Sequence, residues 1–122
     1  PALDALLRLA TNRQSKCAIA VSRKAAVGSA TEFERSVGRE FANGLREGDD
    51  VALDGIRMVL LTKNHQSRDF DCGPVLALYV DPTVFGDYFE EGRITDLIFV
   101  PWLPKHKERF LSDFANARPL RP

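Results

Sequence analysis

The sequence predicts an α/β domain, a three-layer sandwich in which about four helices cover a mixed sheet of about five strands. Three observations lead to this fold class. Asp54-Gly55 separates two apolar runs, as in a two-residue antiparallel hairpin. The runs VLALYV and LIFV are almost continuously apolar, which is typical of strands covered on both faces. A helical pattern between these runs predicts a parallel pair with a right-handed crossover.

The size and charge of the chain narrow the class of protein. A chain of 122 residues is typical of one domain, so residues 1–122 are expected to fold as a single unit with 116–122 as an extended tail. The 17 Lys and Arg residues balance the 17 Asp and Glu residues, which gives zero formal net charge. This balance argues against sequence-independent nucleic-acid binding, which needs excess positive charge, and it favours self-association.

The number of cysteines indicates the cellular compartment of the protein. Cys17 and Cys72 are too few for the disulfide framework of a small secreted domain, so both are expected to be reduced and the protein cytoplasmic. The sequence has no apolar run of about 18–20 residues and no signal pattern at its start, so no membrane partner is expected.

The first half of the chain predicts two helices and one strand. Apolar residues at helical spacing predict a helix over 3–11. The short apolar run 17–21 fits either a buried strand or one turn of buried helix, and the abrupt polar stop after it favours a strand. Apolar residues four apart predict a helix over 31–44, which Gly44 or Gly48 would end.

The second half predicts the rest of the sheet and two more helices. The Asp54-Gly55 turn joins strands 50–53 and 56–63. These elements are followed, in chain order, by a strand over 74–80, a helix over 82–91, a strand over 95–101 and a helix over 104–116.

The arrangement of the strands decides which residues meet. The polar link 64–73 is shorter than the usual parallel crossover, so 56–63 and 74–80 are expected to be antiparallel neighbours. That arrangement predicts Asp81 and Trp102 at one edge of the sheet and Lys63 and His65 at the opposite edge, so no single site would combine them.

The link 64–73 contains residue types that bind metals. It holds one His, two Asp and one Cys, but their spacing matches no metal-binding pattern. Elsewhere the chain offers only His106 and Cys17 as further nitrogen and sulfur ligands. We therefore expect an exposed loop without a metal or another cofactor.

Catalytic interpretations of the same region are also incomplete. Cys72, with His65 or His106 as its base, would need a lowered thiol pKa, yet the adjacent Asp69 and Asp71 would raise it. We therefore expect no catalytic residue here.

A metal-dependent nuclease was the other catalytic alternative. Asp54 and Lys63 are the residue types that it needs, but the position that requires an acid is Leu61. The sequence therefore excludes this interpretation.

Two regions are candidates for binding an anionic ligand. Arg23, Lys24 and Ser29 precede a predicted helix, and a helix N-terminus with nearby cations suits a phosphate or a carboxylate. Asp81 and Trp102 are predicted at the carboxyl ends of two parallel strands, the edge at which α/β sheets bind ligands.

Two functions are compatible with these features. The first is a non-catalytic binding or interaction domain, associated with itself as a homodimer or with another protein. The alternative is a protein or enzyme that binds a phosphorylated metabolite or a nucleotide near Asp81 and Trp102. No nucleic-acid partner is expected, because the basic residues of the C-terminal segment alternate with acids.

Overall fold

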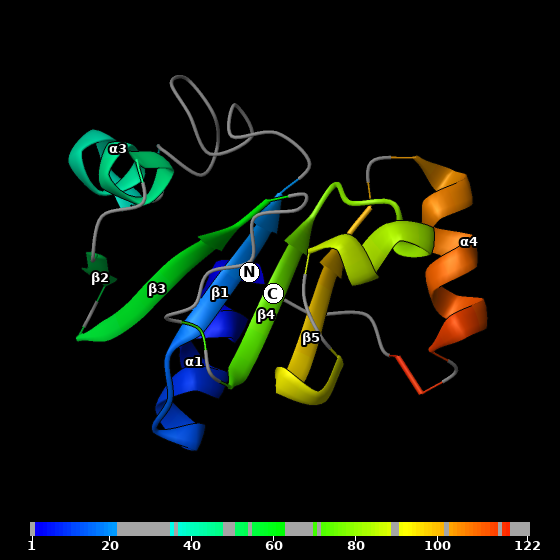
Figure 1. The fold of residues 1–122 in the computed structure, drawn as a ribbon, viewed down its shortest axis with the longest axis horizontal. Helices are drawn as coiled ribbons and strands as arrows, with labels where there is room; N and C mark the ends of the chain where they lie inside the picture. The colour runs from blue at the N-terminus through cyan, green and yellow to red at the C-terminus, as the bar shows by residue number, and fades with distance from the viewer. Residues whose placement is uncertain are drawn as a thin grey trace.

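The computed structural model contains a five-stranded mixed sheet in the order β2-β3-β1-β4-β5 (Figure 1). The structure describes residues 2–21, 35, 37–47, 51–53, 55–62, 70, 72–88, 91–101, 103–114 and 116–117. The elements are α1 (Ala2–Arg13), β1 (Cys17–Val21), α3 (Arg39–Glu47), β2 (Val51–Leu53), β3 (Ile56–Leu61), β4 (Gly73–Leu78), the 3₁₀ helices η2 (Pro82–Asp87) and η3 (Glu91–Arg93), β5 (Ile94–Val100) and α4 (Pro104–Asp113). None of the helices in these ranges is long and apolar enough to cross a membrane.

The sheet confirms part of the predicted topology and corrects part of it. The β2–β3 hairpin is antiparallel and the β4–β5 pair is parallel, as predicted. The antiparallel pairing of 56–63 with 74–80 is wrong. β1 lies between β3 and β4 and is parallel to both of them, so all three strands point the same way.

A short link can make this parallel connection because it need not contain a helix. The end of β3 and the start of β4 are separated by roughly 20 Å along the strands and by about 10 Å across the intervening β1. Ten extended residues reach about 33 Å, so the link is long enough. Phe70, near its end, is buried in the core on one face of the sheet. The other link residues, 63–69 and 71, lie outside the described part of the chain.

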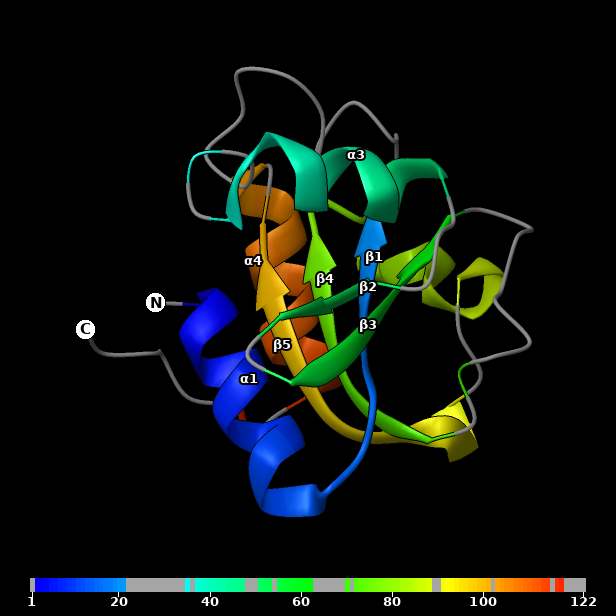
Figure 2. The ribbon, with the colours of Figure 1, turned by 90° about the vertical axis from the view of Figure 1, so that its left-hand side faces the viewer.

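The sheet is covered on both faces, as a three-layer sandwich requires (Figures 1 and 2). The side chains of β1 alternate between the two faces, and all five of its residues are buried. Cys17, Ile19 and Val21 pack against α1 and α3, whereas Ala18 and Ala20 face the core formed with η2 and α4. The predicted fold class is therefore confirmed, with β1 as its central strand.

The predicted helices differ from the observed ones at their ends and in one type. The helix predicted over 3–11 extends to Arg13, and the one predicted over 104–116 ends at Asp113. The helix predicted over 31–44 corresponds to α3, which begins at Arg39 and continues through Gly44 to Glu47. Gly38, just before α3, has a φ of +90°, which is outside the right-handed helical region. Most of the predicted start, 31–34 and 36, lies outside the described residues.

The segment predicted as a helix over 82–91 forms 3₁₀ turns instead. η2 covers Pro82–Asp87 and η3 covers Glu91–Arg93. Val84 has φ −117° and ψ 19°, which interrupts regular helical geometry. Pro82 is compatible with a helix, because it occupies the first position. Gly86 lies inside the predicted helix and weakens it. The apolar residues that predicted the helix nevertheless face the core, because Phe85 and Tyr88 are buried.

Candidate functional site

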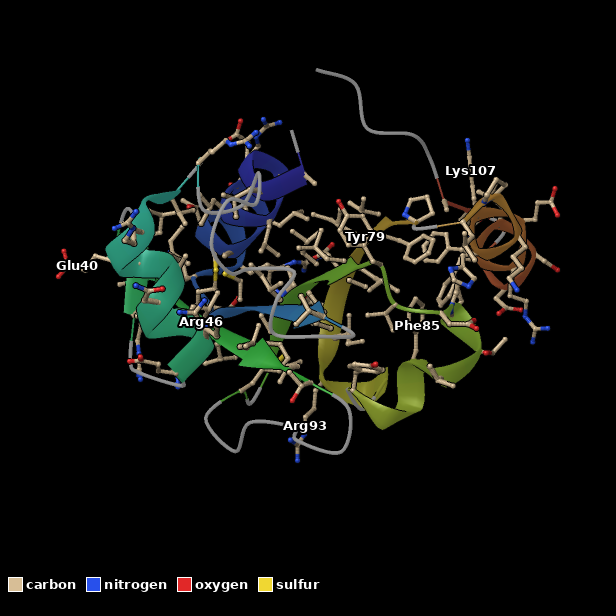
Figure 3. All side chains as sticks on the ribbon, turned by 90° about the horizontal axis from the view of Figure 1, so that it is seen from above. Glu40, Arg46, Tyr79, Phe85, Arg93 and Lys107 are labelled. Atoms are coloured by element: carbon tan, nitrogen blue, oxygen red, sulfur yellow. The ribbon has the colours of Figure 1, made fainter. Side chains whose placement is uncertain are left out.

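The carboxyl ends of β1, β3, β4 and β5 meet at one edge of the sheet, which faces the viewer in Figure 3. Thr62 therefore leaves β3 at the same edge at which Asp81 follows β4. The antiparallel pairing of 56–63 with 74–80, from which Lys63 and His65 were predicted to lie across the sheet from Asp81, is wrong. Lys63 and His65 themselves lie outside the described residues.

This edge includes the point at which the sheet changes its winding direction. From β1 the chain reaches β3 on one side, and then crosses to β4 on the other side. Ligands of open α/β sheets bind in the crevice outside such a switch point. Tyr79, directly after β4, has a left-handed φ of 61°, which is uncommon for a residue other than glycine. Its N–H donates a hydrogen bond of 2.9 Å to the carbonyl of Val100, so the turn after β4 is anchored on the neighbouring strand β5.

Asp81 follows this turn and caps η2. Its Oδ1 accepts hydrogen bonds from the backbone N–H of Thr83 over 3.0 Å and from the Thr83 hydroxyl over 2.9 Å. The backbone hydrogen bond is the main cause of the lowered pKa of Asp81, and the charges of His106 and Lys105 lower it further. The carboxylate is therefore charged near neutral pH, and its Oδ2 points toward α4.

His106 is the residue that Asp81 meets. Its Nε2 lies 3.7 Å from Asp81 Oδ2, and its side chain is only 13% exposed. This distance gives an ion pair when the imidazole is protonated, but it is longer than a direct hydrogen bond. The Nδ1 atom is buried and has no hydrogen-bond partner in the described part of the chain. The pair thus brings the carboxylate that caps η2 against the imidazole of α4.

The first turn of α4 adds positive potential to this edge. Leu103 occupies the N-cap position and makes no side-chain capping bond, and the first turn contains no acidic residue. Lys105, His106 and Lys107 all lie in this turn. The helix dipole is also positive at this end, so a bound anion would be stabilised there.

Sequence reasoning found one residue of the pair and missed the other. Asp81 lies at the predicted edge, whereas Arg23, Lys24, Ser29 and Trp102 fall outside the described residues. A signal for His106 was available. Once 74–80 and 95–101 are predicted to be parallel neighbours, the first turn after the second strand must lie at the edge that holds Asp81.

The cysteines lie elsewhere. Cys72 is exposed and precedes β4, which places it at the amino edge of the sheet, away from the edge that His106 occupies. Cys17 is buried, and this burial raises the pKa of its thiol to about 12. Within the described ranges, no three His, Cys, Asp or Glu side chains are grouped closely enough to hold a metal ion.

Comparison with known proteins adds no relative: no family model, no curated protein and no solved structure matches this chain. The geometry of the carboxyl edge is therefore the evidence on which a function can be argued.

Proposed function

We propose that this domain binds a small anionic ligand, a phosphorylated metabolite or a nucleotide, at the carboxyl edge of its parallel strands. The observation that carries the proposal is the common direction of β1, β3, β4 and β5. Every segment that follows one of these strands starts from the same edge. The sequence directly after β1, β4 and β5 supplies Arg23 and Lys24, Asp81, and Trp102, respectively.

The first turn of α4 is the proposed contact for the anionic group. Lys105 adds charge to the positive end of the helix dipole, His106 offers ring nitrogens as hydrogen-bonding groups, and Leu103 makes no side-chain capping bond there. The Asp81 carboxylate lies 3.7 Å from Nε2 of His106, and this contact sets the position of the imidazole at the edge.

Trp102 and the basic residues after β1 are assigned secondary roles in this proposal. An indole ring can stack on a base or a sugar face, which would distinguish a nucleotide from free phosphate. Arg23 and Lys24 would add charge at the switch point between β1 and β4. The proposal concerns binding alone and assigns no reaction.

A thermal-shift panel with nucleotides, sugar phosphates and inorganic phosphate tests the proposal. A ligand at about 100 times its Kd should stabilise the fold by roughly 2.7 kcal/mol. The Lys105→Ala and His106→Gln variants should lose most of this shift. Arg109→Ala is the matched control, because it removes one charge from the same helix outside its first turn.

Two outcomes would count against this function. One is the absence of a shift with every anion in the panel, at concentrations up to the millimolar range. The other is an equal loss of binding in Arg109→Ala and Lys105→Ala, which would indicate a general charge effect rather than a site.

A further inference from the structure

The exposed large apolar side chains of the described residues are concentrated in one region. Val84 is 37% exposed, Leu103 40%, Leu111 46% and Phe114 36%. Val84 belongs to η2, and the other three lie on α4 or directly at its ends. Elsewhere in the described ranges, apolar side chains of this size are buried or half-buried.

Leu103, Leu111 and Phe114 form a stripe along α4 together with Lys107. Leu103, Lys107 and Leu111 are four residues apart, and Phe114 follows three residues later. Residues at these spacings lie on one face of a helix. These four residues are called the α4 stripe.

The α4 stripe borders the buried face of α4: Lys107 is turned about 60° and Leu111 about 100° from Phe110 around the helix. Phe110, next to Leu111, is the buried residue of α4, and it stacks on Phe99 with ring centroids 4.5 Å apart. Figure 3 shows Lys107 pointing away from Phe85, which also belongs to this core. Phe114 stacks on Phe110 with centroids 4.7 Å apart. One end of the α4 stripe is therefore held in place before any partner binds, which lowers the entropic cost of association.

The charges of α4 oppose its own dipole. Its first turn has no acidic residue, and its last turn has no basic one. Lys105 and Lys107 lie near the positive end of the dipole, and Asp113 lies at the negative end. This order is unfavourable for a lone helix. An antiparallel second copy of the helix would place its negative end beside Lys107, whereas Lys105 is turned about 200° from Lys107 and lies away from the stripe.

We propose that the α4 stripe is the contact between two copies of this chain, with their α4 helices antiparallel across a two-fold axis. The stripe maps onto itself in this arrangement, because Leu103 meets Phe114 of the second copy and Lys107 meets Leu111. A two-fold interface requires such self-complementarity. The zero net charge of the chain adds no long-range repulsion between copies. Asp81 and His106 take no part, so the contact is independent of anion binding.

Sedimentation equilibrium of the full chain and of three variants tests the contact. The native chain should form a dimer as its concentration rises. Leu111→Lys places a new lysine of each copy opposite Lys107 of the other copy. This repulsion should weaken the dimer by more than about tenfold. Ser112→Lys is the matched control: it adds the same charge at the next, exposed position, which is turned about 100° from Leu111.

Lys107→Glu separates the loss of the contact from the loss of the fold. A glutamate in the first turn favours the isolated helix through its dipole. In the dimer, the same glutamate would lie beside the negative end of the second helix. Lys107→Glu should therefore keep or raise the melting temperature of dilute protein and still weaken the dimer.

Three outcomes would overturn the proposal. If the native chain stays monomeric up to millimolar concentration, the α4 stripe does not bind a second copy of this chain. A dimer that Leu111→Lys leaves intact would locate the interface elsewhere. If the Ser112→Lys dimer dissociates as readily as the Leu111→Lys dimer, the weakening comes from added net charge and not from a contact at the α4 stripe.

Discussion

The carboxylate of Asp81 lies 3.7 Å from the imidazole of His106, although the two residues follow different strands. This proximity results from the parallel β4–β5 pair, since both strands end at the same edge. The pair links η2 to α4, and the rings of Phe85 and Phe110 link the same elements beneath it, with centroids 6.3 Å apart. The Asp81–His106 pair and the aromatic core beneath it are therefore both formed between η2 and α4.

The Asp81 carboxylate should make stability depend on pH in acid. Its pKa is lowered in the folded state, so the unfolded chain takes up the proton first as the pH falls. The contribution is complete above the ordinary aspartate pKa of about 3.9 and is lost as the pH falls from there through the lower pKa of the folded state. It should stay below about 1 kcal/mol, because the side chain is 44% exposed.

Asp81→Asn is the comparison for this prediction, because it keeps an oxygen that can cap η2 and removes the titrating group. Urea unfolding of both proteins between neutral pH and about pH 3 measures the difference in free energy of unfolding. The advantage of the native protein should shrink as the pH falls. A constant advantage would exclude Asp81 as the titrating group.

Gly73 should tolerate no side chain. A Cβ at this position would overlap the main-chain oxygen of Lys16 and approach Ser15 Oγ within 3.1 Å. Gly73→Ala should therefore destabilise the fold by about 1–3 kcal/mol, since backbone must move to admit the methyl group. In Gly92→Ala the added Cβ meets no heavy atom within 4 Å, so this control should unfold close to the native midpoint. Equal midpoints for the two variants would contradict the prediction.

The two thiols should differ in reactivity. Cys72 is exposed, whereas Cys17 is buried and its pKa is raised to about 12. Thiolate is the reactive form, so iodoacetamide should label Cys72 alone in the folded protein and both cysteines in denaturant. Mass spectrometry of the digested protein reads the two sites separately. Rapid labelling of Cys17 under native conditions would show that the core around β1 opens readily.

Phe110 should be the residue that holds α4 on the sheet. It is 8% exposed and packs on Phe99, Phe85 and Phe114. Phe110→Ala should cost about 3–5 kcal/mol through lost contacts and the cavity that remains. Leu111→Ala, at the adjacent exposed position, should change stability by less than about 0.5 kcal/mol in dilute protein. Comparable losses would mean that α4 is anchored from a different face.

The fold class could be predicted because its signals are local. The Asp54-Gly55 turn determines the β2–β3 hairpin, and the apolar runs of β4 and β5 indicate strands covered on both faces. Asp81 and Pro82 correctly predicted where the helical segment starts, and Gly86 was the local signal against a regular α-helix over 82–91.

The order of the strands could not be predicted, because pairing depends on contacts between distant segments. Nothing within Cys17–Val21 shows that this strand lies between β3 and β4. The usual length of parallel crossovers argued for an antiparallel β3–β4 pair, and the link 64–73 is an exception to it. The pairing of Asp81 with His106 was missed because His106 was considered as a base for Cys72, as a metal ligand and as part of the basic C-terminal segment, but not as a neighbour of Asp81.

The central position of β1 has a consequence for synthesis on the ribosome. β1 emerges before both of its neighbours, because β3 and β4 come later in the chain. Until they emerge, its backbone has no pairing partner at either edge and its apolar side chains remain uncovered. Such nascent strands are aggregation-prone, and pairing distant segments is slow. Production of this protein should therefore depend on chaperone capacity and on temperature more strongly than its final stability suggests.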